Sequence, residues 1–252
     1  MLLETVRILE VKQSVFANND AQADKLRQEL KAKGIYLLNL MSSPGSGKTT
    51  TAMKIAEELQ RRGVNTHAVA MDNYFPTVNP ATAPRTPEGE IDYESPLCLD
   101  MELLAEHFDA IEHGKTIEVP RYVFKEQRQQ RDSGRFLTAK PGDIVIFEGI
   151  HALNPLVLDA MPKDSVFTIY AGLREEYSHL GQRVLPTRDI RLVRRMIRDF
   201  KHRGHSPRKT ISMWKSVCDG EDKYIKPYKP NADLLLDTSF SYEILVMNSA
   251  LK

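Results

Sequence analysis

The feature that most restricts the fold of this chain is residues 42–49, SSPGSGKT. They follow an apolar run, residues 35–41, that predicts a buried strand, and they open residues 48–62, which predict a helix ended by Gly63. This order is typical of a phosphate-binding loop, because small residues let backbone N–H groups surround phosphate oxygens and the helix N-terminus adds a favourable dipole. The usual motif begins with glycine, where this chain has Ser42. A small serine is compatible with the loop if its backbone angles are not restricted to glycine.

The side chains of this loop suit a magnesium-bound nucleotide. Lys48 supplies a positive charge for the β- and γ-phosphates, and the Thr49 hydroxyl can bind Mg²⁺. The residues expected around the nucleotide are Ser43, Pro44, Gly45, Ser46, Gly47, Lys48, Thr49 and Thr50. The alternative is a glycine-rich helix start that binds nothing, which the order of strand, loop and helix disfavours.

Alternating strand and helix patterns predict the fold class. Buried strands are expected over residues 35–41, 143–147, 165–171 and 232–236, and a further strand over residues 64–71. Helices are expected over residues 48–62 and 97–113, between strands. Such alternation is typical of a doubly wound α/β fold with a mainly parallel sheet, in which ligands bind beyond the carboxyl ends of the strands. The proline-rich segment 73–96 predicts a long loop, residues 116–122 a strand, and the polar segment 125–135 an exposed turn or hairpin.

Composition limits the remaining classes. The chain has 252 residues, a formal net charge of +1 and two cysteines. The near-neutral charge provides no overall attraction to nucleic acid or membranes, and no apolar run approaches the ~20 residues of a membrane span. We therefore expect a cytoplasmic protein with reduced thiols. We divide it into a lead-in segment, residues 1–33, with a helix over residues 20–33, and a domain over residues 34–252.

Three carboxylates are candidates for chemistry. Asp72 follows the second predicted strand and could accept a proton from an attacking hydroxyl, or it could cap a turn. Glu148 ends the strand at residues 143–147 and could hold Mg²⁺, or it could be a solvated acid at a strand end. Glu94 lies beside Tyr93 in the long loop, and its position alone favours an ordinary loop acid.

The segment 188–209 is strongly basic. Arg191, Arg194, Arg195 and Arg198 repeat at spacings of three and four, which predicts one face of a helix. This face could be a solvated surface, a nucleic-acid contact or a lid that closes over a phosphate during transfer. The phosphate-binding loop in the same chain favours the lid, with a hinge at residues 203–204.

From residue 48 onward the sequence resembles the uridine kinase and phosphoribulokinase family of P-loop kinases, most closely the bacterial uridine kinase-like nucleoside kinases. The segments that carry the resemblance are MDNYF (71–75), GEIDYESP (89–96), FEGIHALNP (147–155), DIRLVRRMIRD (189–199), and Trp214 through GEDKYI (220–225). The first part of the chain, residues 6–50, is also similar to the GTPase that assists nickel insertion into hydrogenase, and this similarity includes Ser42.

The kinase resemblance implies roles for individual residues. Asp72 matches the catalytic base, and Glu94 an acid that holds ribose hydroxyls; Tyr122 matches an aromatic residue at the nucleobase, and Tyr74 belongs to the same substrate-binding set. Glu148 matches the acid near Mg²⁺. The lid arginines correspond to Arg191 and Arg194, expected in catalysis, with Arg191 also at the acceptor, and to Arg195, expected at the nucleotide. Residues 73–140 would form the acceptor-binding region and residues 186–220 the lid helices.

The expected activity is therefore Mg²⁺- and ATP-dependent phosphorylation of a small molecule, with the 5′-hydroxyl of a uridine- or cytidine-like nucleoside as acceptor. Uridine kinases often carry a histidine in the turn after the matching tyrosine, where this chain has Gln127 or its neighbours. The alternatives are a sugar-phosphate or pantothenate-type kinase and a nickel-insertion GTPase. Against the nickel-insertion GTPase, this chain has no Asn-Lys-x-Asp segment to bind guanine and no cysteine next to a histidine to bind nickel. We expect no nucleic-acid or membrane partner, and relatives of this kind commonly form homo-oligomers.

Overall fold

A five-stranded parallel sheet lies at the centre of the structure, a computed structural model that describes residues 34, 36–163, 165–174, 176–180, 182–240 and 242–250. The strand order is β11-β8-β1-β7-β2, and every pairing is parallel. The strands are β1 (Tyr36–Ser42), β2 (Thr66–Ala70), β7 (Ile144–Gly149), β8 (Val166–Gly172) and β11 (Leu234–Asp237). All five coincide in position with predicted strands, so the predicted α/β fold with a parallel sheet is confirmed. β11 is not buried as expected: it is an edge strand, and Leu234 and Leu235 are exposed. The helix expected over residues 20–33 lies outside the described residues.

The central strand β1 is buried on both faces. Leu37 and Met41 pack into one apolar core, whereas Leu38 and Leu40 pack into the other. Because successive side chains of a strand point to opposite faces, this division shows that apolar layers cover both sides of the sheet. The continuous apolar run in the sequence therefore has a physical reason.

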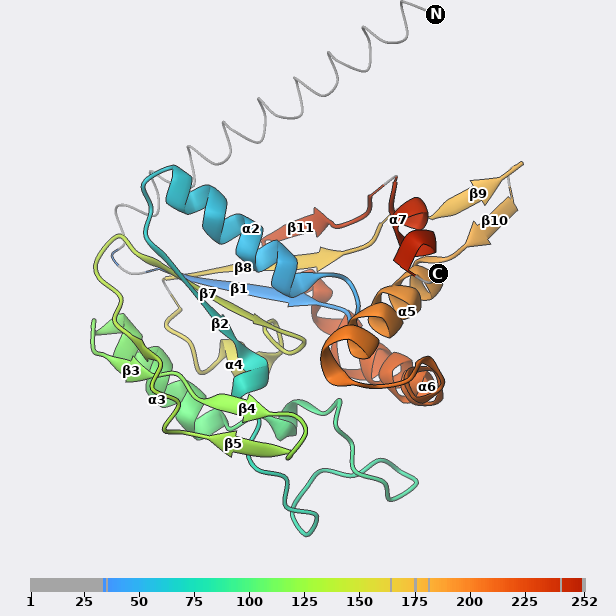
Figure 1. Cartoon of the computed structure of the whole chain (residues 1–252). Helices are drawn as coiled ribbons and strands as arrows, with labels where there is room; N and C mark the ends of the chain where they lie inside the picture. Colours follow the sequence, from blue (N-terminus) through green and yellow to red (C-terminus); the bar gives the residue numbers. More distant parts are fainter. Residues whose placement is uncertain are drawn as a thin grey trace, which may run out of the picture.

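Helices supply these two layers. On one face, α2 (Lys48–Arg61) packs through Ala52 and Ile55. On the other face, α3 (Met101–Glu112) packs through Leu104 and Phe108, and the short α4 (Pro155–Leu158) packs beside it. Figure 1 shows α2 above the sheet and α3 below it. The expected helix over residues 97–113 begins later, because the Asp100 side chain accepts a hydrogen bond from the N–H of Leu103 at the helix start.

The region between β2 and β7 forms small antiparallel pairs rather than a strand of the main sheet. β3 (Ile117–Glu118) pairs with β6 (Phe136–Leu137), and β4 (Arg121–Val123) pairs with β5 (Arg128–Gln130). The single strand expected over residues 116–122 is thus two short strands separated by Val119 and Pro120. The β4–β5 pair is the hairpin that the polar segment 125–135 predicts.

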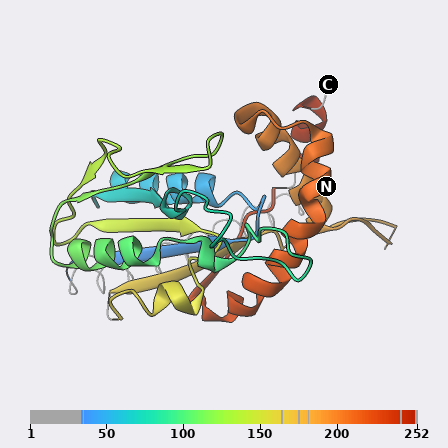
Figure 2. The same ribbon diagram turned by 90° about the horizontal axis from the view of Figure 1, so that it is seen from below.

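The basic segment 188–209 is not one helix. α5 (Thr187–Arg198) continues into a π-helical turn, Asp199–Arg203, and the chain then reverses at Gly204, whose φ is 66°. α6 (Pro207–Tyr224) follows, with the Ser206 side chain accepting from the N–H of Lys209 at its start. Figure 2 shows these two orange helices at the end of the sheet toward which the strand arrows point.

Three further elements were not expected from the sequence. β9 (Tyr177–His179) and β10 (Gln182–Leu185) form an antiparallel pair, and α7 (Glu243–Ala250) follows β11. None of the described helices is both long and apolar enough to cross a membrane.

Candidate active site

The loop between β1 and α2 forms a compact phosphate cradle. The N–H of Ser46 donates to the carbonyl of Ser43 at 3.1 Å, and both Gly45 and Gly47 have left-handed backbone angles with φ of 84° and 83°. A Cβ atom at Gly45 would lie 2.6 Å from the carbonyl oxygen of Arg191, so only glycine fits there. Ser42 is not among the described residues with positive φ, and serine therefore meets no backbone strain where the usual motif has glycine.

Thr49 and Glu148 form a candidate magnesium site at the start of α2. The Thr49 hydroxyl donates to Oε1 of Glu148 at 2.8 Å, and Nζ of Lys48 lies 3.8 Å from Oε2. That Oε2 atom is buried and has no hydrogen-bond partner. Burial, helped by the nearby Asp72, raises the pKa of Glu148, although the charge of Lys48 opposes this shift. A hydroxyl and a carboxylate with an unused oxygen fit Mg²⁺, which takes oxygen ligands and keeps water or phosphate oxygens in its remaining positions.

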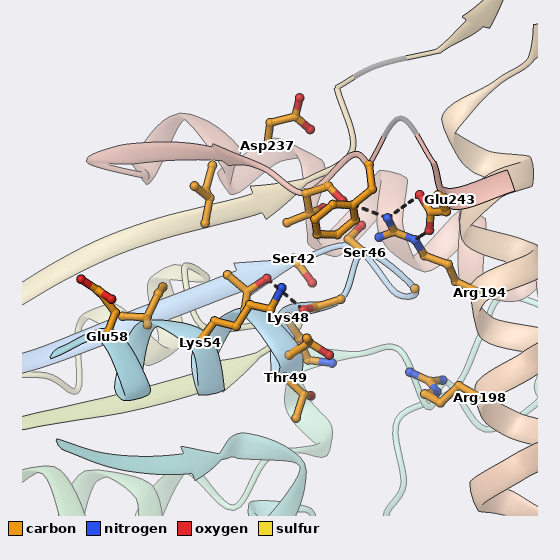
Figure 3. A pocket seen from close by; sticks show the side chains of 18 of the residues that line it. Ser42, Ser46, Lys48, Thr49, Lys54, Glu58, Arg194, Arg198, Asp237 and Glu243 are labelled. Atoms are coloured by element: carbon orange, nitrogen blue, oxygen red, sulfur yellow. Dashed lines mark hydrogen bonds and ion pairs between the residues drawn. The ribbon is translucent and has the colours of Figure 1, made fainter. Parts of the chain in front are cut away.

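A cavity of about 1150 Å³ opens over the cradle. Its walls are the loop, one side of α2, the carboxyl side of β11 and the arginines of α5. Figure 3 shows Lys48 and Thr49 on one side of this cavity and Arg194 and Arg198 on the other. Arg194 is already engaged, because it binds the Glu243 carboxylate and donates to the carbonyl of Thr238 at 2.9 Å.

A second cavity, of about 910 Å³, lies beside the first. Asp72, Glu94 and Tyr122 are among its lining residues. Asp72 reaches it from the 3₁₀ turn Met71–Tyr74, directly after β2. Burial raises the pKa of Glu94, and the positive charge of Arg195 opposes that shift. Three residues line both cavities, namely Lys48, Arg195 and Arg198.

Aromatic rings form one wall of the second cavity. The ring of Tyr122 makes edge-to-face contacts with Phe75 and Phe124, at centroid distances of 5.6 Å and 5.1 Å. The N–H of Tyr122 donates to the side-chain oxygen of Asn73 at 3.2 Å, which joins β4 to the turn that carries Asp72. The guanidinium of Arg203 lies 4.7 Å from the centre of the Phe124 ring.

Asp199 forms ion pairs with three arginines at the junction of the cavities. Its carboxylate lies 3.3 Å from Nε of Arg195, 2.8 Å from a nitrogen of Arg198 and 3.7 Å from a nitrogen of Arg203. Burial alone would raise the pKa of Asp199, but the charge and hydrogen bonds of Arg198 and its neighbours outweigh burial and lower the pKa. The carboxylates of Glu94 and Asp72 also act on Arg195 and Arg203. Three guanidinium groups at this junction offer N–H donors that suit phosphate oxygens.

Two residues expected at the substrate do not reach either cavity. Tyr74 is fully buried because the 3₁₀ turn directs Asp72 outward and Tyr74 into the core. Its hydroxyl lies 2.8 Å from Nδ1 of His107. Arg191 is 4% exposed and binds Glu221 and the carbonyl of Pro44 beneath the loop. Arg191 lies on the side of α5 that packs against the loop, so it is not a free arginine of a lid in this structure.

Three buried polar residues near the site carry little recognisable signal in the sequence. They are His151, Asp199 and Glu221. His151 is 1% exposed, and its ring makes an edge-to-face contact with Tyr224 at a centroid distance of 6.4 Å. For Asp199, the spacing of four residues to Arg195 and to Arg203 could have indicated ion pairs within the segment. The role of Glu221 depends on contacts with residues distant in sequence, which no local pattern predicts.

A parallel sheet whose central strand leads into a phosphate cradle, with arginine-bearing helices at the same edge, defines a P-loop kinase fold. The model of the phosphoribulokinase / uridine kinase family matches residues 37–242, and the chain belongs to this family. Membership in this family implies that the chain binds a nucleotide and acts on a small molecule.

Individual relatives agree with this assignment. The chain is 28% identical to a uridine kinase of Staphylococcus aureus over 85% of its own length and 93% of that protein. Among solved structures it is similar to a possible uridine kinase from Bacillus stearothermophilus, with a TM-score of 0.52 and 18% identity over 84% of this chain and 100% of the other. It is also similar to a proposed fructose transport system kinase from Silicibacter sp. TM1040, with a TM-score of 0.57 and 17% identity over 84% and 97% of the two chains. These structural similarities concern the fold. The similarity of residues 6–50 to the nickel-insertion GTPase falls mostly outside the described residues.

Proposed function

We propose that this protein transfers the γ-phosphoryl group of ATP to a hydroxyl group of a small molecule. The observation that carries the proposal is the meeting of two cavities at Lys48, Arg195 and Arg198. The phosphate cradle lies in the first cavity and the Asp72 carboxylate in the second. A donor phosphate and an acceptor hydroxyl bound in these cavities would face each other across the shared residues, as in-line transfer requires.

The side chains support each part of this transfer. Asp72 accepts the hydroxyl proton while the acceptor oxygen bonds to the γ-phosphorus and the bond between that phosphorus and the β,γ-bridging oxygen breaks. Lys48, Arg195 and Arg198 hold the phosphoryl oxygens and stabilise their negative charge. When bound by Thr49 and Glu148, Mg²⁺ would neutralise charge on the β- and γ-phosphates.

For the acceptor we propose the 5′-hydroxyl of a nucleoside, of the uridine or cytidine kind. The aromatic wall at Phe75, Tyr122 and Phe124 suits a flat base. Glu94 offers carboxylate oxygens to sugar hydroxyls from another side of the same cavity. The similarity to uridine kinases supports the same choice.

A second candidate acceptor is an alcohol that carries a negative charge, such as a sugar phosphate or a pantothenate-like acid. The observation that favours it is a group of basic side chains among the residues that line the acceptor cavity. Arg203, His205 and Lys209 all line this cavity and do not line the nucleotide cavity. A phosphate or carboxylate on the acceptor could pair with them.

The test is Mg²⁺-dependent ADP release from ATP with uridine, cytidine, ribulose 5-phosphate, pantothenate or no acceptor. Stimulation by a nucleoside alone is the expected result. Stimulation only by an anionic alcohol would keep the kinase activity and select the second acceptor class. A parallel series with GTP covers the switch-type alternative, because slow GTP hydrolysis without stimulation by any acceptor would contradict the kinase proposal.

A further inference from the structure

The helical turn at residues 220–224 of α6 lies against both loops of the proposed site. On one side, the hydroxyl of Ser43 in the phosphate cradle donates to Oε1 of Glu221 at 2.6 Å. The hydroxyl of Tyr170 lies 2.9 Å from the same Ser43 oxygen. Glu221 is 1% exposed and Ser43 3%, so this contact is shielded from water.

Arg191 completes the attachment of the cradle. Its two terminal nitrogens donate to the two carboxylate oxygens of Glu221 at 2.7 Å and 2.9 Å, and its Nε donates to the carbonyl of Pro44 at 2.9 Å. Burial alone would raise the pKa of Glu221, but the hydrogen bonds and charge of Arg191 outweigh it and lower the pKa. The buried carboxylate of Glu221 therefore accepts hydrogen bonds both from Ser43 in the loop and from Arg191, which itself donates to the loop.

The same helical turn also contacts the loop that carries Asp92 and Glu94, called the acceptor loop below. A Cβ atom at Gly220 would lie 2.4 Å from Cβ of Glu94, so the helix backbone approaches this loop as closely as a glycine permits. The hydroxyl of Tyr224 donates to the Asp92 carboxylate at 2.8 Å. Neighbouring residues of one rigid helix thus touch the nucleotide loop and the acceptor loop.

We propose that Glu221 is a positioning residue that fixes the phosphate cradle, through Ser43 and Arg191, at the place where the acceptor loop can meet it. The inference rests on the proposed function only for the identity of the nucleotide. Glu221 touches no reacting atom, and its effect passes through Ser43 and the carbonyl of Pro44. If Glu221 lost its negative charge, the buried guanidinium of Arg191 would lose its ion-pair partner. The bonds that hold the cradle at Ser43 and at the carbonyl of Pro44 would then be weakened.

A buried ion pair could instead stabilise only the fold, and the experiment separates these roles. In the full-length protein with Mg²⁺, the dissociation constants of a non-hydrolysable β,γ-imido analogue of ATP and of AMP are measured by calorimetry, together with the melting temperature. Glu221→Gln is expected to weaken binding of the ATP analogue by about tenfold or more while AMP binding changes little. A purely structural role would lower the melting temperature and leave the ratio of the two affinities unchanged.

The matched control is an exposed ion pair on the same helix. Nζ of Lys215 donates to the Asp219 carboxylate at 2.5 Å, and both side chains are exposed. Asp219→Asn is expected to leave the affinity ratio unchanged. Ser43→Ala removes the cradle hydroxyl without unpairing Arg191, so it remains informative if Glu221→Gln does not fold.

For Ser43→Ala we expect the same selective loss, smaller in size. An unchanged affinity ratio in both variants would overturn the inference. Wild-type protein that binds the ATP analogue no better than AMP would overturn the nucleotide assignment of the proposed function as well. A normal wild-type preference that persists in the variants would overturn only the role of Glu221.

Discussion

Asp72 and Glu148 are acids at the carboxyl ends of neighbouring strands, but their surroundings differ. Glu148 is 5% exposed and contacts Lys48 and Thr49 at the cradle, whereas Asp72 lines the acceptor cavity. The parallel pairing of β2 with β7 places Ala70 opposite Glu148, which brings the two acids to one edge. This geometry supports a metal-binding role for Glu148 and a proton-accepting role for Asp72.

Replacing Asp72 tests that division of roles. Asp72→Asn keeps the size of the side chain but removes its ability to accept the hydroxyl proton. We expect ATP affinity within about twofold of wild type and transfer slower by ~10²–10⁴-fold. Steady-state kinetics and ATP binding are compared with Asp132→Asn, a change at an exposed position. Turnover equal to wild type would exclude Asp72 from the mechanism.

His151 predicts a pH dependence of stability. Burial lowers its pKa to about 4, although the nearby carboxylates of Asp72 and Asp92 oppose the shift. The unfolded chain binds a proton on this imidazole below its ordinary pKa of 6.5, whereas the folded chain does so only near pH 4. Stability is therefore lost as the pH falls through this window, by about 2 kcal/mol between pH 7 and pH 5.

Denaturant unfolding at pH 7 and pH 5 measures this loss. Because other groups also titrate, the relevant quantity is the difference between wild type and His151→Asn, which has no imidazole. We expect the wild type to lose about 2 kcal/mol more than the variant over this interval. Equal losses would show that the buried histidine does not contribute to the pH dependence.

Asp72 and Glu148 lie at the sheet edge where acids that follow strands are expected, whereas Tyr74 and Arg191, expected at the substrate, reach neither cavity. Glu94 lines the acceptor cavity, which its place in the sequence alone did not indicate. The ends of parallel strands share one edge, so acids that follow strands can be placed from sequence alone. Whether Tyr74 faces the core or the cavity depends on the 3₁₀ turn after β2. The surroundings of Arg191 depend on Glu221, thirty residues further along the chain. Such contacts leave no periodic pattern in the sequence.

Among the elements, α6 makes contacts that its amphipathic pattern does not reveal. Gly220 lets the helix backbone approach Glu94, and a glycine within a helix is unfavourable by about 1 kcal/mol relative to alanine. Its presence there is explained by the close approach, because any side chain would displace the acceptor loop.

Gly220→Ala tests this explanation. The added Cβ should push Glu94 away and raise the KM for the acceptor by about tenfold, a loss of ~1.4 kcal/mol in binding, while the KM for ATP changes less. Ser216→Ala, an exposed change in the same helix, is the control. A Gly220→Ala protein with both KM values unchanged would show that the loop tolerates a side chain there.

Most elements of the main sheet were predictable because they are apolar runs between turn-forming residues; β2, which begins Thr66-His67, is the exception. The break between α5 and α6 was harder to predict, because the basic residues keep a helical spacing from residue 188 up to Gly204. β9, β10 and α7 were not expected because they are short and lie outside the two apolar cores.

At the scale of the whole molecule, a near-neutral chain carries a local basic region. The net charge is +1, yet Arg195, Arg198 and Arg203 all lie near the carboxylate of Asp199 where the two cavities meet. Composition therefore gave no indication of this region, and spacing gave only the positions of the arginines. The sheet topology brings the cradle, the Asp72 turn and these arginines to one edge, which places a proposed donor site beside a proposed acceptor site.

The central claim is direct transfer between these sites. The most direct measurement follows the γ-phosphoryl group of labelled ATP in the presence of Mg²⁺ and uridine, with wild-type protein and Asp72→Asn. We predict that wild-type protein moves the label to the 5′-hydroxyl of uridine as a phosphate ester, with little inorganic phosphate, and that Asp72→Asn binds ATP but transfers the label ~10²–10⁴-fold more slowly. Label released only as inorganic phosphate, with uridine and with every other alcohol tested, would contradict the account.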